Sequence, residues 1–195
     1  MSKDDVRDSV ASHCSAALDW MAETCGIQCV LIGGAVRDLL RGGIPKDWDF
    51  YCLGSDPREL RRRLVRHSED MRKPFKRHPA LVAEMKTPFG QAQVFSSQCV
   101  SAREIVSRSD WNVSAFGFDG EFIGEDRLNQ IAPGETLRLL EVSNPINTLS
   151  RGFEFAKRFE MAFRVQDVVA LCEAVASGKF RRPNRAIRRI KRRGF

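Results

Sequence analysis

The first apolar pattern along the chain has the spacing of a helix. Between Val6 and Cys25, apolar side chains recur every three or four residues, which predicts an amphipathic helix. They are Val10, Cys14, Ala17, Leu18 and Met21. Gly26 follows, and glycine is a common residue just after the end of a helix.

After Gly26 the pattern changes to short apolar runs separated by glycine. Gln28 to Ile32 predicts a strand, Gly33-Gly34 a turn, and Val36 to Arg41 a short helix that Gly42-Gly43 ends. Asp47 to Leu53 alternates between apolar and polar residues and predicts a second strand. The predicted order is therefore strand, glycine turn, helix, strand.

Turn residues divide the middle of the chain into one helix after Asp56-Pro57 and two hairpins. Thr87-Pro88-Phe89-Gly90 and Asp119-Gly120 are the turn signals of the hairpins. The expected elements are a basic helix from Arg58 to about His67, strands over Ala80 to Lys86 and Gln91 to Ser96, a short helix over Ser101 to Val106, and strands over Asn112 to Phe118 and Glu121 to Ile123.

The C-terminal part has only helical periodicity. Apolar positions from Leu149 to Phe159 and from Val168 to Val175 predict two helices. We place a boundary near Leu140, which gives a main domain over 1–140 and a helical segment over 141–195 that ends in an arginine-rich tail.

Composition excludes wholesale disorder and points to a basic protein. Apolar residues make up 43% and charged residues 29% of the 195 residues, which is ordinary for a globular chain. The net charge is +7, and the segment from Phe180 to Phe195 is rich in arginine and contains no acid. Clustered arginines can neutralise phosphates, so this tail is either a nucleic-acid contact or a solvated end.

Cysteine and histidine spacing gives little support for a zinc site. The six cysteines include no C-x-x-C pair and the three histidines are scattered, so buried reduced thiols are the simpler interpretation. The N-terminus has no apolar signal core, and no apolar run approaches the roughly 18 residues of a membrane span. We therefore expect a cytoplasmic protein without membrane contact.

Asp47 and Asp49 are the strongest candidates for catalysis. Two apart on a predicted strand, their carboxylates project from one face while Trp48 projects from the other. Mg²⁺ binds carboxylates together with substrate phosphates, so the pair suits a nucleoside triphosphate site. An isolated D-x-D pair is more often solvated, and the residues upstream decide the interpretation.

Gly33-Gly34 precedes this pair at a strand-to-helix turn. Without Cβ atoms there, backbone N–H groups can approach phosphate oxygens. Arg37 can add a charged contact to the triphosphate, and Asp38 can orient its guanidinium or cap the helix. The simpler alternative is a glycine turn beside a surface ion pair.

The whole stretch LIGGAVRDLLRGGIPKDWDF resembles a motif of the class II CCA-adding enzymes and bacterial poly(A) polymerases. That motif reads G-G-x-V-R-D, a short helix, G, then D-x-D. The matching residues are Gly33, Gly34, Val36, Arg37, Asp38, Gly42, Lys46, Asp47 and Asp49. The resemblance implies a nucleotidyltransferase head in which the glycines bind the triphosphate and the two aspartates bind the catalytic metals.

Arg108 to Phe116, RSDWNVSAF, resembles the R-R-D-F-T-x-N-A motif of the same family, which is associated with the nucleotide sugar. Arg108 and Asp110 match, whereas three other positions differ. A third acid that the family places between the two motifs falls here on Gln93. Glu84 on the opposite strand or Asp110 is an alternative source of that charge, and a site with two carboxylates is the other possibility.

We therefore expect an α/β fold: a nucleotidyltransferase head with a small mixed sheet of about five strands backed by helices, plus a short C-terminal helical neck. The expected activity is Mg²⁺-dependent transfer of a nucleoside monophosphate from ATP or CTP to an acceptor hydroxyl, with an RNA 3′ end as the leading acceptor. The alternatives are a small-molecule or protein acceptor, or a nucleotide- or RNA-binding module without turnover. The oligomeric state is not predicted.

Overall fold

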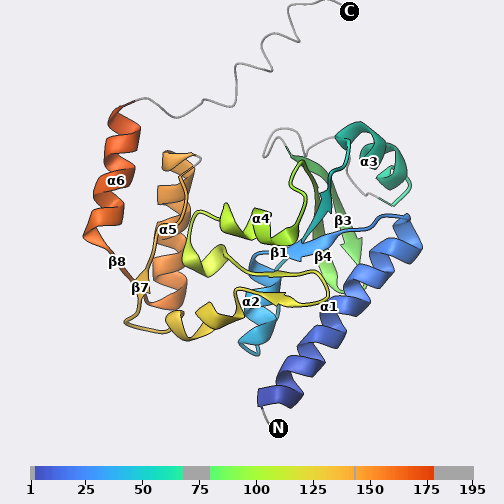
Figure 1. Cartoon of the computed structure of the whole chain (residues 1–195), viewed down its shortest axis with the longest axis horizontal. Coiled ribbons are helices and arrows are strands. Elements are labelled where there is room, and N and C mark those ends of the chain that lie inside the picture. The colour runs from blue at the N-terminus through green and yellow to red at the C-terminus, as the bar shows by residue number, and fades with distance from the viewer. Residues whose placement is uncertain (1–2, 68–79, 143, 178–195) are drawn as a thin grey trace, which may run out of the picture. The chain divides into compact units, whose positions relative to one another are not determined.

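The computed structural model describes residues 3–67, 80–142 and 144–177 (Figure 1). The chain forms two compact units. The first comprises Met1–Ser109 and Val113–Asn129, and the second comprises Asp110–Asn112 and Gln130–Phe195. The units thus divide earlier than the boundary expected near Leu140, and a short piece of the RSDWNVSAF segment belongs to the second unit.

A six-stranded sheet forms the centre of the first unit, where about five strands were expected. Its strands lie in the order β3-β4-β2-β1-β5-β6. Only the β2–β4 pair is parallel, so the sheet is mixed as predicted. The strands are β1 (Val30–Ile32), β2 (Trp48–Leu53), β3 (Leu81–Thr87), β4 (Gly90–Ser97), β5 (Gly117–Phe118) and β6 (Phe122–Ile123).

Helices cover both faces of this sheet. They are α1 (Lys3–Cys25), α2 (Gly34–Leu40), α3 (Pro57–Leu64) and α4 (Ala102–Ser107). The alternation of β1 sends Val30 and Ile32 to the face where they pack with Ala102 and Val106 of α4. Leu31 lies fully buried on the opposite face, and α1 and α2 both contact β1. Each predicted helix of this unit is present, and α3 ends at Leu64 rather than near His67.

The aromatic side chain of Trp48 anchors β2 to α1. Its ring centroid lies 5.6 Å from that of His13 and 5.8 Å from that of Phe89. Its indole Nε1 donates a hydrogen bond to the carbonyl oxygen of Phe89 at 3.0 Å. Trp48 is only 1% exposed, so this contact fixes which face of β2 is turned into the core.

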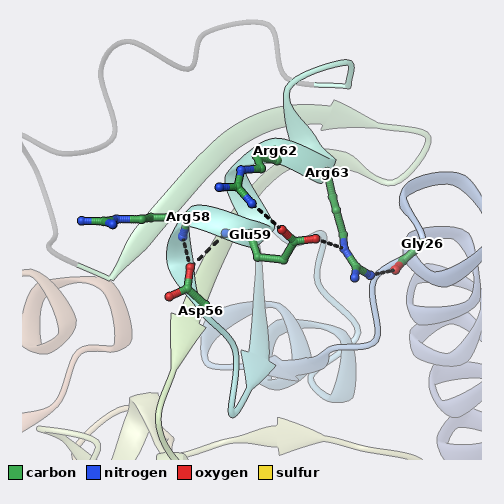
Figure 2. A network of polar contacts seen from close by, with 6 residues as sticks. All are labelled: Gly26, Asp56, Arg58, Glu59, Arg62 and Arg63. Carbon is green, nitrogen blue, oxygen red and sulfur yellow. Dashed lines mark hydrogen bonds and ion pairs between the residues drawn. The ribbon is translucent and has the colours of Figure 1, made fainter.

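A network of polar contacts begins α3 and ties it to the end of α1 (Figure 2). The carboxylate of Asp56 accepts hydrogen bonds from the backbone N–H groups of Arg58 and Glu59, which is the geometry of an N-cap. Glu59 pairs with Arg62 and Arg63, and Arg63 donates to the carbonyl oxygen of Gly26. These contacts lower the pKa of Asp56, mainly through the backbone hydrogen bonds, and that of Glu59, mainly through Arg63.

The strand predicted over Asn112 to Phe118 is wrong in its first half. Asn112–Ser114 forms a short 3₁₀ helix, and only Gly117–Phe118 is a strand. The backbone N–H of Asn112 donates to the carbonyl oxygen of Arg138, and the carbonyl of Val113 accepts from Arg37. Because these backbone groups have partners outside the sheet, the segment has no need of strand pairing.

The second unit is built on α5 (Pro145–Phe159) and α6 (Val165–Ala176), the two helices that the periodicity predicts. A small parallel pair of β7 (Thr136–Leu137) and β8 (Ala162–Phe163) was not expected. Fully buried Trp111 donates its indole N–H to the carbonyl oxygen of Thr148 at 2.8 Å. A Cβ on Gly152 would lie 2.5 Å from the Trp111 ring, so glycine is required where α5 meets this indole.

The cysteines carry free thiols, as the sequence indicated. Only Cys172 is exposed. Burial raises the pKa of Cys14 and of Cys52 to about 12, and it also raises the pKa of Cys25 and Cys29. These four thiols therefore stay protonated at neutral pH.

Among the described residues, no helix combines the length and the apolar character that a bilayer crossing requires. The arginine-rich tail from Phe180 to Phe195 lies outside the described residues.

Candidate active site

The glycine turn lies directly beside Asp49. Gly33 lies between β1 and α2 and has a φ of 93°, a conformation that favours glycine. A Cβ on Gly33 would lie 3.5 Å from Oδ2 of Asp49. The structure therefore places the glycine turn beside one carboxylate of the D-x-D pair, that of Asp49.

The two glycines differ in what their amides can do. The N–H of Gly33 donates to the carbonyl oxygen of Phe116 at 2.7 Å, which holds the turn against the segment before β5. Gly34 is the first residue of α2, where helical N–H groups have no acceptor within the helix. Of the two amides, that of Gly34 is thus the better placed to meet an anion.

Arg37 is buried behind the turn and does not face solvent. It is 2% exposed. Its Nε and Nη2 contact Oδ1 of Asp38 at 2.8 and 2.7 Å, and its Nη1 donates to the carbonyl oxygen of Val113 at 2.8 Å. A Cβ on Gly34 would lie 3.2 Å from Nη2. Asp38 therefore holds the guanidinium by an ion pair, and Arg37 lies against the glycine turn from within the protein.

Asp47 and Asp49 flank the Trp48 anchor. Asp49 lies on β2, whereas Asp47 immediately precedes it. The strand thus begins at Trp48, one residue later than predicted. Both are half-buried. Because Trp48 is turned into the core, Asp49 projects from the opposite face of the sheet, together with Tyr51, whose ring stacks on Phe95 at 4.7 Å.

Gln93 occupies the neighbouring position on that face. It is the register partner of Asp49 across the parallel β2–β4 pair, and of Glu84 across the antiparallel β3–β4 pair. The strand register thus places Gln93, an amide, directly next to Asp49, where the family motif suggested an acid. Glu84 lies one strand further from Asp49 and accepts a hydrogen bond from Gln93 Nε2 at 3.1 Å.

The other possible source of a third acid, Asp110, is engaged within the second unit. Its Oδ2 pairs with Arg151 of α5 at 2.9 Å, and its Oδ1 accepts the N–H of Trp111 at 3.0 Å. Arg108, at the end of α4, pairs with Glu104 and stays largely exposed. The described residues contain no group of three or more His, Cys, Asp or Glu side chains that suits a metal ion.

Sequence reasoning missed the backbone part of this site. The carbonyl oxygens of Val113 and Phe116 fix Arg37 and Gly33, and no side-chain pattern could have revealed them. The sequence likewise contained no sign that Arg151 of α5 would be the partner of Asp110.

The donor set fits a hard divalent cation. Asp47 and Asp49 supply carboxylate oxygens, and Gln93 supplies an amide oxygen on the same face as Asp49. Such oxygen atoms are the ligands of Mg²⁺ and Ca²⁺. The open backbone of Gly33 beside Asp49 also leaves space next to the carboxylate that a side chain would fill.

Comparison with solved structures relates this fold to tRNA-processing enzymes. The chain matches the Thermotoga maritima CCA-adding enzyme complexed with tRNA-CCA with a TM-score of 0.57 and 17% identity, over 90% of this chain and 48% of that one. It matches a CCA-adding enzyme in complex with ATP with a TM-score of 0.58 and 16% identity, over 90% of this chain and 44% of that one.

A third match is a tRNA nucleotidyltransferase complexed with a primer tRNA and an incoming ATP analog. The TM-score is 0.52 at 21% identity, over 83% of this chain and 50% of that one. The chain thus spans about half the length of these proteins. No protein-family model and no curated protein sequence matches the chain. The structure and these matches confirm the predicted fold, a small mixed sheet backed by helices, and this fold is similar to that of the solved CCA-adding enzymes.

Proposed function

We propose that this protein transfers a nucleoside monophosphate from ATP or CTP to the 3′ hydroxyl of an RNA and releases pyrophosphate. One observation carries the proposal: the Gly33 turn lies next to the carboxylate of Asp49. A Cβ atom added to Gly33 would lie 3.5 Å from Oδ2 of Asp49. A triphosphate at the turn would therefore lie beside the carboxylates. The similarity to solved structures that contain tRNA, CTP or ATP supports the same chemistry.

In this proposal Asp47 and Asp49 hold Mg²⁺, whose positive charge would favour deprotonation of the attacking hydroxyl and offset the charge of the leaving pyrophosphate. The Gly34 amide binds a phosphate oxygen, because its N–H has no acceptor within α2. Arg37 and Asp38 form a buried pair that holds the turn in place. Arg37 thereby contributes to triphosphate binding indirectly, by supporting the backbone of the glycine turn.

Arg108 and Asp110 take different roles. Arg108 is exposed and can reach a nucleotide sugar by releasing Glu104. Asp110 positions the neck, because its carboxylate pairs with Arg151 of α5. The ion pair thus favours a role in the neck for Asp110 over contact with the nucleotide sugar.

One observation favours a second candidate, a nucleotide- or RNA-binding module without turnover. Gln93 stands beside Asp49 where an acid was expected. A protein or small-molecule hydroxyl would be the acceptor if a nucleotide is transferred but RNA is not labelled.

The test is incubation with each labelled nucleoside triphosphate, Mg²⁺ and total RNA. Transfer to RNA is expected for the natural chain and its loss for the double variant Asp47→Ala with Asp49→Ala. The matched control removes two exposed carboxylates elsewhere, Asp19→Ala with Asp119→Ala, and should retain transfer. Nucleotide binding without labelling of any acceptor would refute the transferase proposal.

The arginine-rich tail is tested separately by deleting residues 181–195. Fewer neutralised phosphates should weaken RNA binding and lower its dependence on salt concentration. Unchanged RNA affinity at low salt would remove the tail from the proposal.

A further inference from the structure

Three adjacent strands place Asp49, Gln93 and Glu84 in one row. Gln93 is the register partner of Asp49 on one side and of Glu84 on the other. Register partners project from the same face, and neighbouring strands lie about 4.8 Å apart. The neutral amide of Gln93 thus stands between two carboxylates on the half-buried side of β4, and we name these three residues the carboxamide row.

The contact with Glu84 determines which way the amide faces. Gln93 Nε2 donates to Glu84 Oε1 at 3.1 Å. An ionised carboxylate only accepts hydrogen bonds, whereas an amide has a donor on one side and an acceptor on the other. The reversed amide would set two acceptor oxygens against each other. Oε1 of Gln93 therefore takes no part in the contact with Glu84, and Asp49 is the register partner of Gln93 on the strand at its other side.

We propose that Oε1 of Gln93 is a neutral oxygen ligand of the divalent cation held by Asp49, and that Glu84 is the positioning residue that fixes this orientation. The proposal rests on the metal-binding role given above to Asp49. Amide carbonyl oxygens bind hard cations. Gln93, which stands where an acid was expected, therefore still supplies a ligand atom.

The charge of the row gives this arrangement a functional consequence. A site with an amide in place of a third carboxylate attracts a divalent cation less strongly when no nucleotide is present. The triphosphate brings the missing negative charge, so the cation and the nucleotide should bind with strong mutual dependence.

The experiment measures Mn²⁺ binding to the full chain by electron paramagnetic resonance of the free ion, with and without a non-hydrolysable ATP analogue. Gln93→Leu removes the oxygen and should weaken Mn²⁺ binding about tenfold or more, and Glu84→Gln, which frees the amide to rotate, should weaken it by a smaller factor. Gln98→Leu, an exposed change of the same type, is the control and should have no effect.

A swap variant tests the orientation directly. Glu84→Gln with Gln93→Glu keeps one amide and one carboxylate in contact but moves the acid next to Asp49. It should bind Mn²⁺ more tightly than the natural chain and make binding less dependent on the nucleotide. Urea unfolding of each variant shows that the fold is intact before binding is compared.

The outcomes separate this proposal from the proposed function. Equal Mn²⁺ affinity of the natural chain and Gln93→Leu, with a large loss in Asp49→Ala, would refute the ligand role of Gln93 and leave the metal role of Asp49 standing. Unchanged affinity in Asp49→Ala would overturn the metal site itself. A tenfold loss in Gln93→Leu together with tighter binding by the swap variant supports the carboxamide row.

Discussion

Asp110 and Arg151 form a 2.9 Å ion pair in which the aspartate side chain is 9% exposed and the arginine side chain 51% exposed. The pair joins the residue matched to the family's sugar motif to the first long helix of the second unit. Arg151 also lies over the ring of Phe155, 5.4 Å from its centroid. The side chain of Asp110 is thus almost fully buried, whereas that of Arg151 is half exposed to solvent.

The first prediction concerns the strength of this pair. Asp110→Asn keeps the acceptor for the N–H of Trp111 and removes the charge, while Arg151→Gln removes the cation. Because Arg151 is half exposed, a double-mutant cycle from urea unfolding should give a coupling of only about 1 kcal/mol, smaller at high salt. Strict additivity of the two changes would show that the pair contributes nothing.

The second prediction separates a supporting role of Arg37 from direct triphosphate binding. Arg37→Gln removes the cation that contacts Oδ1 of buried Asp38 and should lower the free energy of unfolding by about 3–5 kcal/mol. Arg66→Gln removes an exposed arginine of the same unit and should change it little. If the Arg37→Gln variant unfolds at the same urea concentration as the natural chain but loses nucleotide binding, Arg37 contacts the triphosphate itself.

The third prediction follows from the contact between α5 and an indole ring. Gly152→Ala would force its Cβ to within 2.5 Å of Trp111, and such overpacking costs about 1–3 kcal/mol. Ser150→Ala, at an exposed position of the same helix, should be near neutral. Adding Trp111→Phe, which removes the clashing atoms, should relieve part of the effect of Gly152→Ala. Additive losses in the double variant would contradict this account.

The fourth prediction is a pH dependence at the start of α3. The pKa of Asp56 is lowered by the backbone hydrogen bonds it accepts. A lowered pKa in the folded state means that Asp56 stabilises the protein above its unfolded pKa of about 3.9, and that this contribution is lost as the pH falls through the folded value. Asp56→Asn should therefore be less stable than the natural chain near pH 6 and approach it in acid. Parallel stability curves would exclude the effect.

Much of the first unit was predictable because its signals are local. The order of strand, glycine turn, helix and strand follows from residues close together in sequence, and Asp49 of the D-x-D pair lies beside Gly33. The two helices of the second unit also follow from periodicity alone.

What the sequence could not provide is the pairing of distant segments. Asn112–Ser114 was expected to continue the strand toward Phe118, but its backbone partners are Arg138 and Arg37, which only the tertiary fold brings near. In the motif, Arg37 looks like an exposed phosphate ligand. In the structure it is buried, and its Nη1 donates a hydrogen bond to the carbonyl oxygen of Val113. The role of Gln93 depends on Glu84, and the hydrogen bond between them shows only in the β3–β4 register.

The parallel pairing of β2 with β4 also orders the assembly of the site during folding. β3 and β4 form a tight hairpin, so Glu84 and Gln93 meet across a short loop, whereas Asp49 reaches Gln93 only after the long connection through α3 and β3 has closed. Closing a longer loop costs more entropy and slows folding. We therefore expect the contact between Glu84 and Gln93 to form first and Asp49 to join it last, so that the three side chains lie in one row only when the sheet is complete.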